Sequence, residues 1–166
     1  MNYVFDSSSL IYLGKLKVLE KIKLLGRGFI PKKVYKEVVE KGFQRGELEA
    51  KYIRQLIKNN QFIIKGAKAN ISSIIETPIL SEADKEVILL AKETKAIAIT
   101  DDRYAKQIAQ SIGVKSHGSL YVILKLVEKK EISKKEAINY VDKMIKLGFY
   151  LSTEKYKEVL YIINKI

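Results

Sequence analysis

The sequence contains no cysteine and no tryptophan, and it has only one histidine and two prolines among its 166 residues. Without cysteine, the chain can form neither a disulfide framework nor a thiolate metal site. His117 is the only imidazole, so a metal site built from several histidines is excluded, and a Ser-His-Asp mechanism would need His117 itself as the base. Carboxylates are therefore the main candidates for chemistry.

Negative charge is also scarce. The chain has 31 Lys and Arg residues against 19 Asp and Glu residues, which gives a net charge of +12. This excess predicts a polyanionic partner, nucleic acid before membrane, although a composition rich in Lys, Glu and Ile also stabilises heat-adapted proteins. No apolar run approaches the roughly 20 residues of a membrane span, and the first residues lack a basic region followed by an apolar stretch. We expect a cytoplasmic protein with no membrane partner.

The apolar residues follow the periods of short strands that alternate with helices, which predicts an α/β fold with one core. Strands are expected over residues 2–5, 29–30, 61–65, 96–99 and 113–115. Helices are expected over 7–25, 32–41, 47–60, 82–92, 102–111, 120–128, 134–147 and 153–166, with Gly42 and Gly148 as helix ends. No structure is assigned to the connection 66–77, and His117 is expected in a surface turn.

The stretch 95–103 changes in one step from apolar to doubly acidic. Residues 96–99 show no polar alternation, which is typical of a strand covered on both faces in a parallel sheet. Asp101 and Asp102 follow where that strand ends, and in open parallel α/β sheets ligands gather beyond the carboxyl ends of the strands. The pair is therefore either a helix cap or a metal site.

Asp6 and Glu37 occupy comparable positions. Asp6 follows the β-prone run 2–5 and precedes three serines that suit a first helical turn, so it can be a helix cap or a ligand. Glu37 lies in the helix that Pro31 opens, one step nearer to the apolar stripe than Glu40. For both glutamates the simpler interpretation is a solvated helix face.

Asp84 heads the buried side of the helix 82–92, because it shares one face with the apolar residues three, four and seven positions later. Its alternative role is a capping box, in which Asp84 would bond the backbone amide of Ser81. A different and more polar side of this helix is expected to carry Glu82, Lys85, Glu86 and Leu89.

The acids can be interpreted together as parts of one site. If the first and fourth strands are neighbours in a parallel sheet, Asp6 and Asp101 emerge at the same edge. Close carboxylates raise each other's pKa and are costly unless a cation lies between them. Mg²⁺ or Mn²⁺ prefers such oxygen ligands, and it can orient a water for attack on a phosphodiester.

Four motifs follow one another along the chain: Phe5-Asp6-Ser-Ser8-x-Leu-Ile, Pro31-x-x-Val34-x-x-Glu37-Val38, Leu80-Ser-x-x-Asp84-x-x-Val-x-Leu-Leu-Ala91 and Ile99-Thr-Asp101-Asp102-Arg103-x-Ala105. In this order and in this strand-helix context, the chain resembles the PIN domain nucleases over about residues 2–126. The resemblance implies a three-layer α/β/α sandwich with a central, mainly parallel sheet. It also implies an Mg²⁺- or Mn²⁺-dependent endoribonuclease that acts on single-stranded or structured RNA.

The same resemblance implies roles for individual residues. Asp6, Glu37, Asp84 and Asp101 or Asp102 would be metal ligands, with Ser8 as a polar supporting residue. Our hypothesis is a ribonuclease in which Asp6, Asp84 and Asp101 bind the ion and water attacks the phosphodiester. Asp102 would be a further ligand, and Asp102 and Glu37 would complete the set of groups around the ion. All five acids are thus expected to be catalytic residues.

Residues 1–130 are expected to form the PIN-like nuclease domain, and 131–166 a C-terminal helical extension packed on it. Many small prokaryotic PIN proteins are toxins that a protein antitoxin restrains and that often form homodimers, so the resemblance implies these two partners besides RNA. The extra C-terminal helices depart from the commonest short toxins.

Arg103, Lys32 and Lys33 are candidates for phosphate contacts because of their positions. For the lysines the alternative is a solvated surface charge, and Arg103 could equally pair with Asp84 or Asp101. A non-catalytic RNA-binding or scaffold protein with the same fold is the main alternative function. Against it stand the intact acids, because a degenerate domain has no reason to retain carboxylates that repel one another.

Overall fold

The computed structural model describes residues 1–69 and 77–166, so most of the unassigned connection 66–77 lies outside the described residues. Five strands form one sheet in the order β3-β2-β1-β4-β5, and all four neighbouring pairs are parallel. The strands are β1 (Asn2–Phe5), β2 (Arg27–Pro31), β3 (Phe62–Lys65), β4 (Ile97–Ile99) and β5 (Ser116–His117). The predicted three-layer α/β/α fold with a parallel sheet is confirmed.

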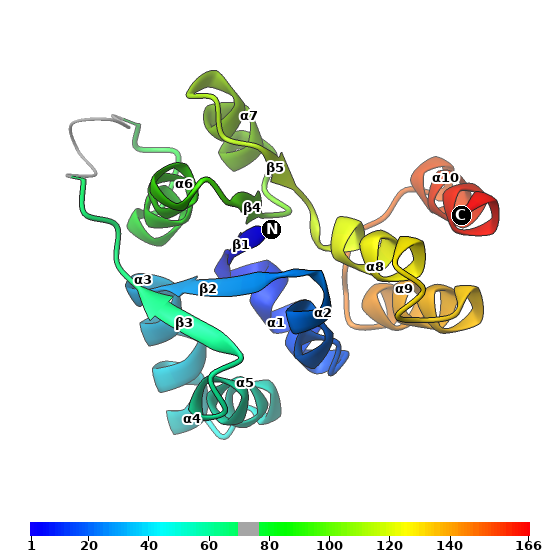
Figure 1. Cartoon of the computed structure of the whole chain (residues 1–166), viewed down its shortest axis with the longest axis horizontal. Coiled ribbons are helices and arrows are strands. Elements are labelled where there is room, and N and C mark those ends of the chain that lie inside the picture. The colour runs from blue at the N-terminus through cyan, green and yellow to red at the C-terminus, as the bar shows by residue number, and fades with distance from the viewer. Residues whose placement is uncertain (70–76) are drawn as a thin grey trace.

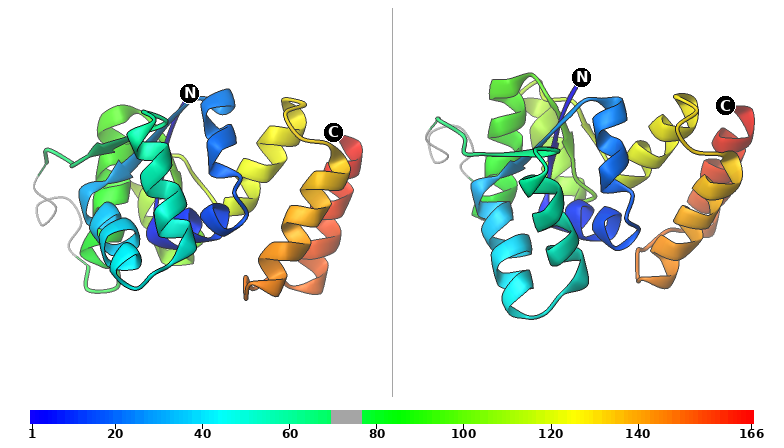
Figure 2. Two further views of the ribbon diagram at one scale, coloured as in Figure 1. Left: turned by 90° about the horizontal axis from the view of Figure 1, so that it is seen from below. Right: turned by 60° about the horizontal axis from the view of Figure 1, so that its bottom comes forward.

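Helices cover both faces of the sheet. Figure 1 shows α6 and α7 on one side and α1, α2 and α5 on the other. Both views in Figure 2 show α9 and α10 side by side, with α8 between them and the rest of the molecule. The helical segments are α1 (Ser7–Lys15), η1 (Leu19–Lys21), α2 (Ile22–Leu25), α3 (Lys32–Val34), η2 (Tyr35–Glu40), α4 (Lys41–Gln44), α5 (Leu48–Lys58), α6 (Glu82–Thr94), α7 (Arg103–Ser111), α8 (Ser119–Glu128), α9 (Lys134–Lys146) and α10 (Thr153–Lys165).

The two central strands bring distant acids to one edge. In β1 and β4, Phe5 pairs with Ile99 in parallel register, and both side chains are fully buried. The amide of Asp6 then donates to the carbonyl oxygen of Ile99 at 3.0 Å. Asp6 and Asp101 therefore leave neighbouring strands at the same carboxyl edge, where the helices α1, α7 and α8 also begin.

The helix expected over 7–25 is interrupted. It ends at Lys15, and Lys17 adopts a left-handed conformation with φ 56°. The amide of Lys17 donates to Gly14 and that of Val18 to Leu13, which is the bonding pattern of a Schellman helix end. This turn lets Val18 enter the core, where it is fully buried.

Gly42 does not end its helix, which continues to Gln44. A Cβ at Gly42 would lie 2.9 Å from the Cβ of Ala50, so the glycine permits close packing of α4 on α5. The segment before it, η2, is π-helical, whereas a regular α-helix was expected.

The last strand also differs from the prediction. It consists of Ser116 and His117, whereas a strand over 113–115 and a turn at His117 were expected. His117 pairs with Ile99 of β4 in parallel register, and the amide of Thr100 donates to the carbonyl oxygen of His117 at 2.8 Å. The structure thus places His117 on the outer strand of the sheet.

The C-terminal helices share one continuous set of buried side chains with the rest of the chain. Ser133 and Glu136 form a capping box at the start of α9. In α9, Val141 and Met144 are fully buried, and in α10 Ile163 is as well. The boundary near residue 130 stays a prediction. Within the described residues, no helix is long and apolar enough to cross a membrane.

Gly28 provides a test of the packing between β2 and β3. A Cβ at this position would lie 2.5 Å from the ring of Phe62, which packs edge-on against Phe5 in the core. We expect Gly28→Ala to lower the free energy of unfolding by about 1–3 kcal/mol in urea titrations. In Gly14→Ala the added Cβ would lie 3.2 Å from the Ile53 side chain and 3.3 Å from the Cβ of Glu49, which is a milder overlap, and the gain in helix propensity of about 1 kcal/mol opposes the cost. Equal losses in the two variants would contradict this account.

Candidate active site

Asp6 is buried at the end of β1, with 3% of its surface exposed. It caps α1, because its Oδ1 accepts a hydrogen bond from the amide of Ser9 at 2.7 Å, and Ser8 Oγ lies 3.3 Å from the same oxygen. Burial raises the pKa of Asp6, and the negative charge of Asp101 raises it further, whereas hydrogen bonds from Ser9 and Thr100 lower it. Asp6 therefore serves as a cap and remains poorly solvated as an anion.

Asp101 lies two residues beyond β4 and is held by the start of α8. Ser119 donates its backbone amide to Oδ1 at 2.8 Å and its hydroxyl to Oδ2 at 2.5 Å. A Cβ at Gly118 would lie 2.6 Å from Oδ1, so only glycine lets the backbone approach this carboxylate so closely. The positive end of the α8 dipole also favours the negative charge.

Asp102 and Asp84 act at the starts of their own helices. Asp102 caps α7 by accepting from the amide of Ala105 at 2.7 Å. Asp84 accepts from the hydroxyl of Ser81 at 2.6 Å, and that hydroxyl accepts from the amide of Asp84. The expected bond from Asp84 to the backbone amide of Ser81 is not the one formed, because the Ser81 hydroxyl takes its place.

Glu37 is exposed and lies in η2. Its Oε2 accepts from the hydroxyl of Ser7 at 2.7 Å, and Ser7 follows Asp6 directly in the chain. This bond ties the helical segment after β2 to the helix after β1 at the carboxyl edge of the sheet. π-helical turns of this kind are frequent at functional sites.

The predicted ligands do not all converge in this conformation. Across residues 1–69 and 77–166, no three His, Asp or Glu side chains lie close enough together to hold one metal ion. The physical reason is that serine hydroxyls and helix amides bind Asp84, Asp101 and Asp102 where these acids stand. Asp6 and Asp101 nevertheless follow neighbouring strands at one edge of the sheet, and the charge of Asp101 makes the smallest of the contributions to the shifted pKa of Asp6.

Two carboxylates fit a hard divalent cation. Each oxygen of Asp6 and Asp101 has two lone pairs, so the hydrogen bonds described leave room for further ligation. Mg²⁺ is commonly bound by one or two carboxylates together with waters and substrate phosphates. The raised pKa of Asp6 supports this fit, because a cation between the two acids would relieve the cost of ionising a buried carboxyl.

The acids have no basic partners. In the part of the chain that the structure describes, none of the five predicted acids lies within 4.0 Å of a Lys or Arg nitrogen, so Arg103 pairs with neither Asp84 nor Asp101. Lys33 instead pairs with Glu82 at 3.3 Å, which agrees with a surface role. Lys32 is an exposed side chain at the start of α3.

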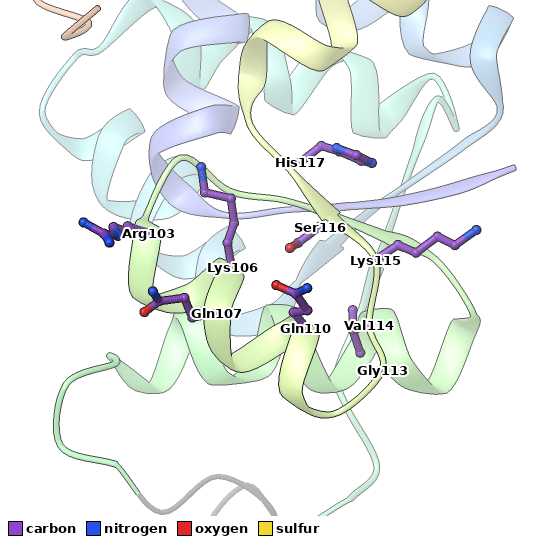
Figure 3. A pocket seen from close by; sticks show the side chains of 9 residues that line it. All are labelled: Arg103, Lys106, Gln107, Gln110, Gly113, Val114, Lys115, Ser116 and His117. Atoms are coloured by element: carbon purple, nitrogen blue, oxygen red, sulfur yellow. The ribbon is translucent and has the colours of Figure 1, made fainter.

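Basic side chains gather beside β5 instead. A cavity of about 640 Å³ lies between α7 and this strand, and we call it the basic trough. In Figure 3, the side chains of Arg103 and Lys106 leave α7 in different directions, and that of Lys115 leaves the segment before β5 on the far side from Arg103. The trough is lined by Arg103, Lys106, Gln107, Gln110, Gly113, Val114, Lys115, Ser116 and His117.

The sequence pattern missed several residues that organise this edge. Glu86 was expected on a polar side but is 5% exposed, and it accepts from the amide of Lys33 at 2.8 Å. Leu89 on the same side is also buried, because α6 packs against α3 and α7 as well as the sheet. Ser119 could have been found from its place after the last strand, where a Gly-Ser pair begins a helix.

Comparisons with known proteins agree with this architecture. The family model DUF3368, which describes a PIN domain, matches residues 2–165. Among solved structures, PAE2754 from Pyrobaculum aerophilum has a TM-score of 0.53 at 18% identity and covers 80% of this chain and 97% of its own. A PilT N-terminus domain protein, SSO1118, from the hyperthermophilic archaeon Sulfolobus solfataricus P2 has a TM-score of 0.52 at 17% identity, with 74% and 90% covered. No curated protein matches significantly.

The burial of Asp6 predicts a pH-dependent effect of removing its charge. Since folding raises the pKa of Asp6, its protonated form favours the folded state, and this contribution is lost as pH rises through the folded-state pKa. Asp6→Asn keeps an acceptor for the α1 cap. In metal-free buffer we expect this variant to be more stable than the wild type at neutral pH.

The stability gain should grow from about pH 4, near the ordinary pKa of an aspartate, and level off above the raised pKa. Chemical unfolding in EDTA at several pH values measures it. Asp142→Asn is the control, because Asp142 lies on α9 and accepts from the hydroxyl of Tyr156. An Asp6→Asn variant that is less stable than the wild type at every pH would contradict the prediction.

Proposed function

Since this chain belongs to the PIN domain family, we propose that it is a divalent-metal-dependent endoribonuclease whose site centres on Asp6 and Asp101. PIN domains are in general nucleases. The observation that carries the proposal is the burial of Asp6 beside a second carboxylate where two neighbouring parallel strands end. A cation held by both acids would offset the cost of ionising a carboxyl in this buried position.

We propose Mg²⁺ or Mn²⁺ as the cofactor. Such an ion would lower the pKa of a bound water and stabilise the negative charge that develops on the phosphorus oxygens during hydrolysis. Asp6 and Asp101 would hold it through the lone pairs that their hydrogen bonds leave free. Ser119 and Gly118 fix the orientation of Asp101, and Ser9 fixes that of Asp6.

The remaining acids have supporting roles in this proposal. Glu37 and Asp84 are each held by one serine hydroxyl, and they would complete the shell of the ion. Ser8 lies within 3.4 Å of both oxygens of Asp6 and orients that carboxylate. Asp102 is assigned mainly to the cap of α7, which fixes the direction of the chain directly after Asp101.

RNA is the proposed substrate because the chain carries a net charge of +12 and because the lining of the basic trough includes Arg103, which directly follows Asp102 in the chain. Arg103 and Lys106 stand on α7, the helix that Asp102 caps, so they are better placed for phosphate contacts than Lys32 and Lys33. A toxin role, with an antitoxin partner and a homodimer, stays a prediction.

Cleavage of labelled RNA tests the nuclease directly. We expect cleavage with Mg²⁺ or Mn²⁺ and none with EDTA, and we expect Asp101→Asn to lower the rate by more than about 100-fold, beyond the 10- to 100-fold typical of losing an outer partner. Asp142→Asn should cleave like the wild type.

Equal rates for Asp101→Asn and the wild type, or cleavage in EDTA, would exclude the mechanism. The non-catalytic RNA-binding alternative predicts a different result, namely RNA binding without cleavage by the wild type in either metal.

Ser119→Ala tests how Asp101 is held. Losing the hydroxyl that binds Oδ2 should weaken Mn²⁺ affinity about 10- to 100-fold, because outer-shell partners orient metal ligands. Thermal unfolding measures this without any cleavage. At 100 times its dissociation constant, the ion should stabilise the wild type by about 2.7 kcal/mol, which is roughly 5–10 °C in Tm.

Ser111→Ala is the matched control, because the Ser111 hydroxyl bonds only its own helix at Ile108. A Tm shift with Mn²⁺ that is the same in Ser119→Ala and in the wild type would show that Ser119 does not position a metal ligand.

A further inference from the structure

A second cavity lies between the core and the C-terminal helices. It has a volume of about 790 Å³, and we call it the aromatic cavity. Its walls come from α1, β5, α8, the loop between α9 and α10, and α10 itself. Five of its lining residues carry aromatic rings, and they are Tyr12, His117, Tyr121, Phe149 and Tyr150.

Four of the five rings form two pairs. His117 stacks on Tyr121 with ring centres 4.0 Å apart and planes 7° apart. Tyr12 and Phe149 meet edge-on at 5.3 Å. Tyr150 is 88% exposed and lines the cavity from the loop between α9 and α10. An exposed aromatic side chain in the lining of such a cavity offers a face on which another flat ring can stack.

Charged side chains of both signs surround the cavity. Lys106, Lys155 and Asp101 line it, and Lys125 lies 5.6 Å from the centre of the Tyr121 ring. Lys155 and Lys125 pair with neighbouring glutamates at 2.8 and 2.6 Å, whereas Lys106 has no carboxylate within 4.0 Å among the described residues. Burial lowers the pKa of His117, and the charges of Lys125, Lys106 and Lys115 lower it further, so the imidazole is neutral at pH 7. A neutral stack in a cavity that Lys106 also lines suits a ligand that combines an aromatic ring with a negative group.

The cavity joins the proposed catalytic site. Asp101 and Ser8 belong to its lining, and it shares Lys106, Ser116 and His117 with the basic trough. The acid Asp101, the aromatic cavity and the basic trough are therefore contiguous along β5.

We propose that the aromatic cavity binds an unpaired base of single-stranded RNA next to the phosphodiester that is cleaved, with Tyr150 as a stacking residue. This inference rests on the proposed function, since it places the base beside Asp101. Stacking on aromatic side chains needs an open base face, so a base within a duplex cannot enter. The C-terminal helices thereby become part of the substrate site.

Binding of an RNA oligonucleotide that contains 2-aminopurine tests the proposal without cleavage. The full chain is titrated in EDTA, and the chain itself lacks tryptophan, so the probe gives a clean signal. We expect the single strand to bind with quenching of the probe, and a duplex of the same sequence to bind without quenching. Tyr150→Ala should weaken binding of the single strand about 5- to 100-fold, and Tyr150→Phe should restore it.

Tyr161→Ala is the matched control, because Tyr161 is a 59% exposed tyrosine of α10 outside the lining of the cavity. Equal binding by Tyr150→Ala and the wild type, or equal quenching by the duplex, would overturn the proposal. Failure of any single strand to bind would overturn it as well and would leave the cavity to a protein partner.

The two proposals fail separately. Cleavage that depends on Asp101 but not on Tyr150 would retain the nuclease and remove the base site. Quenching that depends on Tyr150, without cleavage in either metal, would retain the base site for RNA and remove the nuclease.

Discussion

Hydrogen bonds from helix starts and serine hydroxyls to carboxylates determine the carboxyl edge of this sheet. Asp6 and Asp102 cap the helices that follow them, and Asp101 accepts two bonds from Ser119 at the start of α8. These donors are neutral, so they orient negative charge without cancelling it. The carboxylates at this edge are therefore held in fixed orientations without a basic partner, which is an environment that suits a hard cation.

The parallel sheet makes this arrangement necessary. In parallel strands the carboxyl ends all point one way, and the helices that return to the sheet begin at that edge. The register of Phe5 with Ile99 then fixes the distance along the strands between Asp6 and Asp101. Backbone hydrogen bonds hold this register, including the bond from the amide of Asp6 to the carbonyl oxygen of Ile99.

Much of this followed from the sequence. An apolar run followed by an acid occurs at Asp101 and Asp102 and, less clearly, at Asp6. This pattern predicted two parallel strands that end at the same edge of the sheet, since a buried parallel strand and a helix cap each have a clear local signal. The sequence also predicted Asp84 near a serine at a helix start.

The remainder depended on contacts between segments far apart in the chain. Gly42 looks like a helix end, but Ala50 of another helix decides its role. Glu86 is polar by type, yet it is buried because helices lie on several sides of α6. No period in the sequence encodes that Ser119 reaches Asp101 across 18 positions.

The shortness of β5 has a consequence for how this sheet meets other molecules. An outer strand usually offers a row of unpaired amides and carbonyls along which another chain can extend the sheet, and this is a common route to aggregation. Here the outer strand has two residues, with Lys115 directly before it. Because β5 offers few backbone groups and has a positive charge beside it, addition of a further strand is unfavourable there. A molecule that binds this side of the sheet is therefore recognised by side chains, through their charge and their aromatic rings.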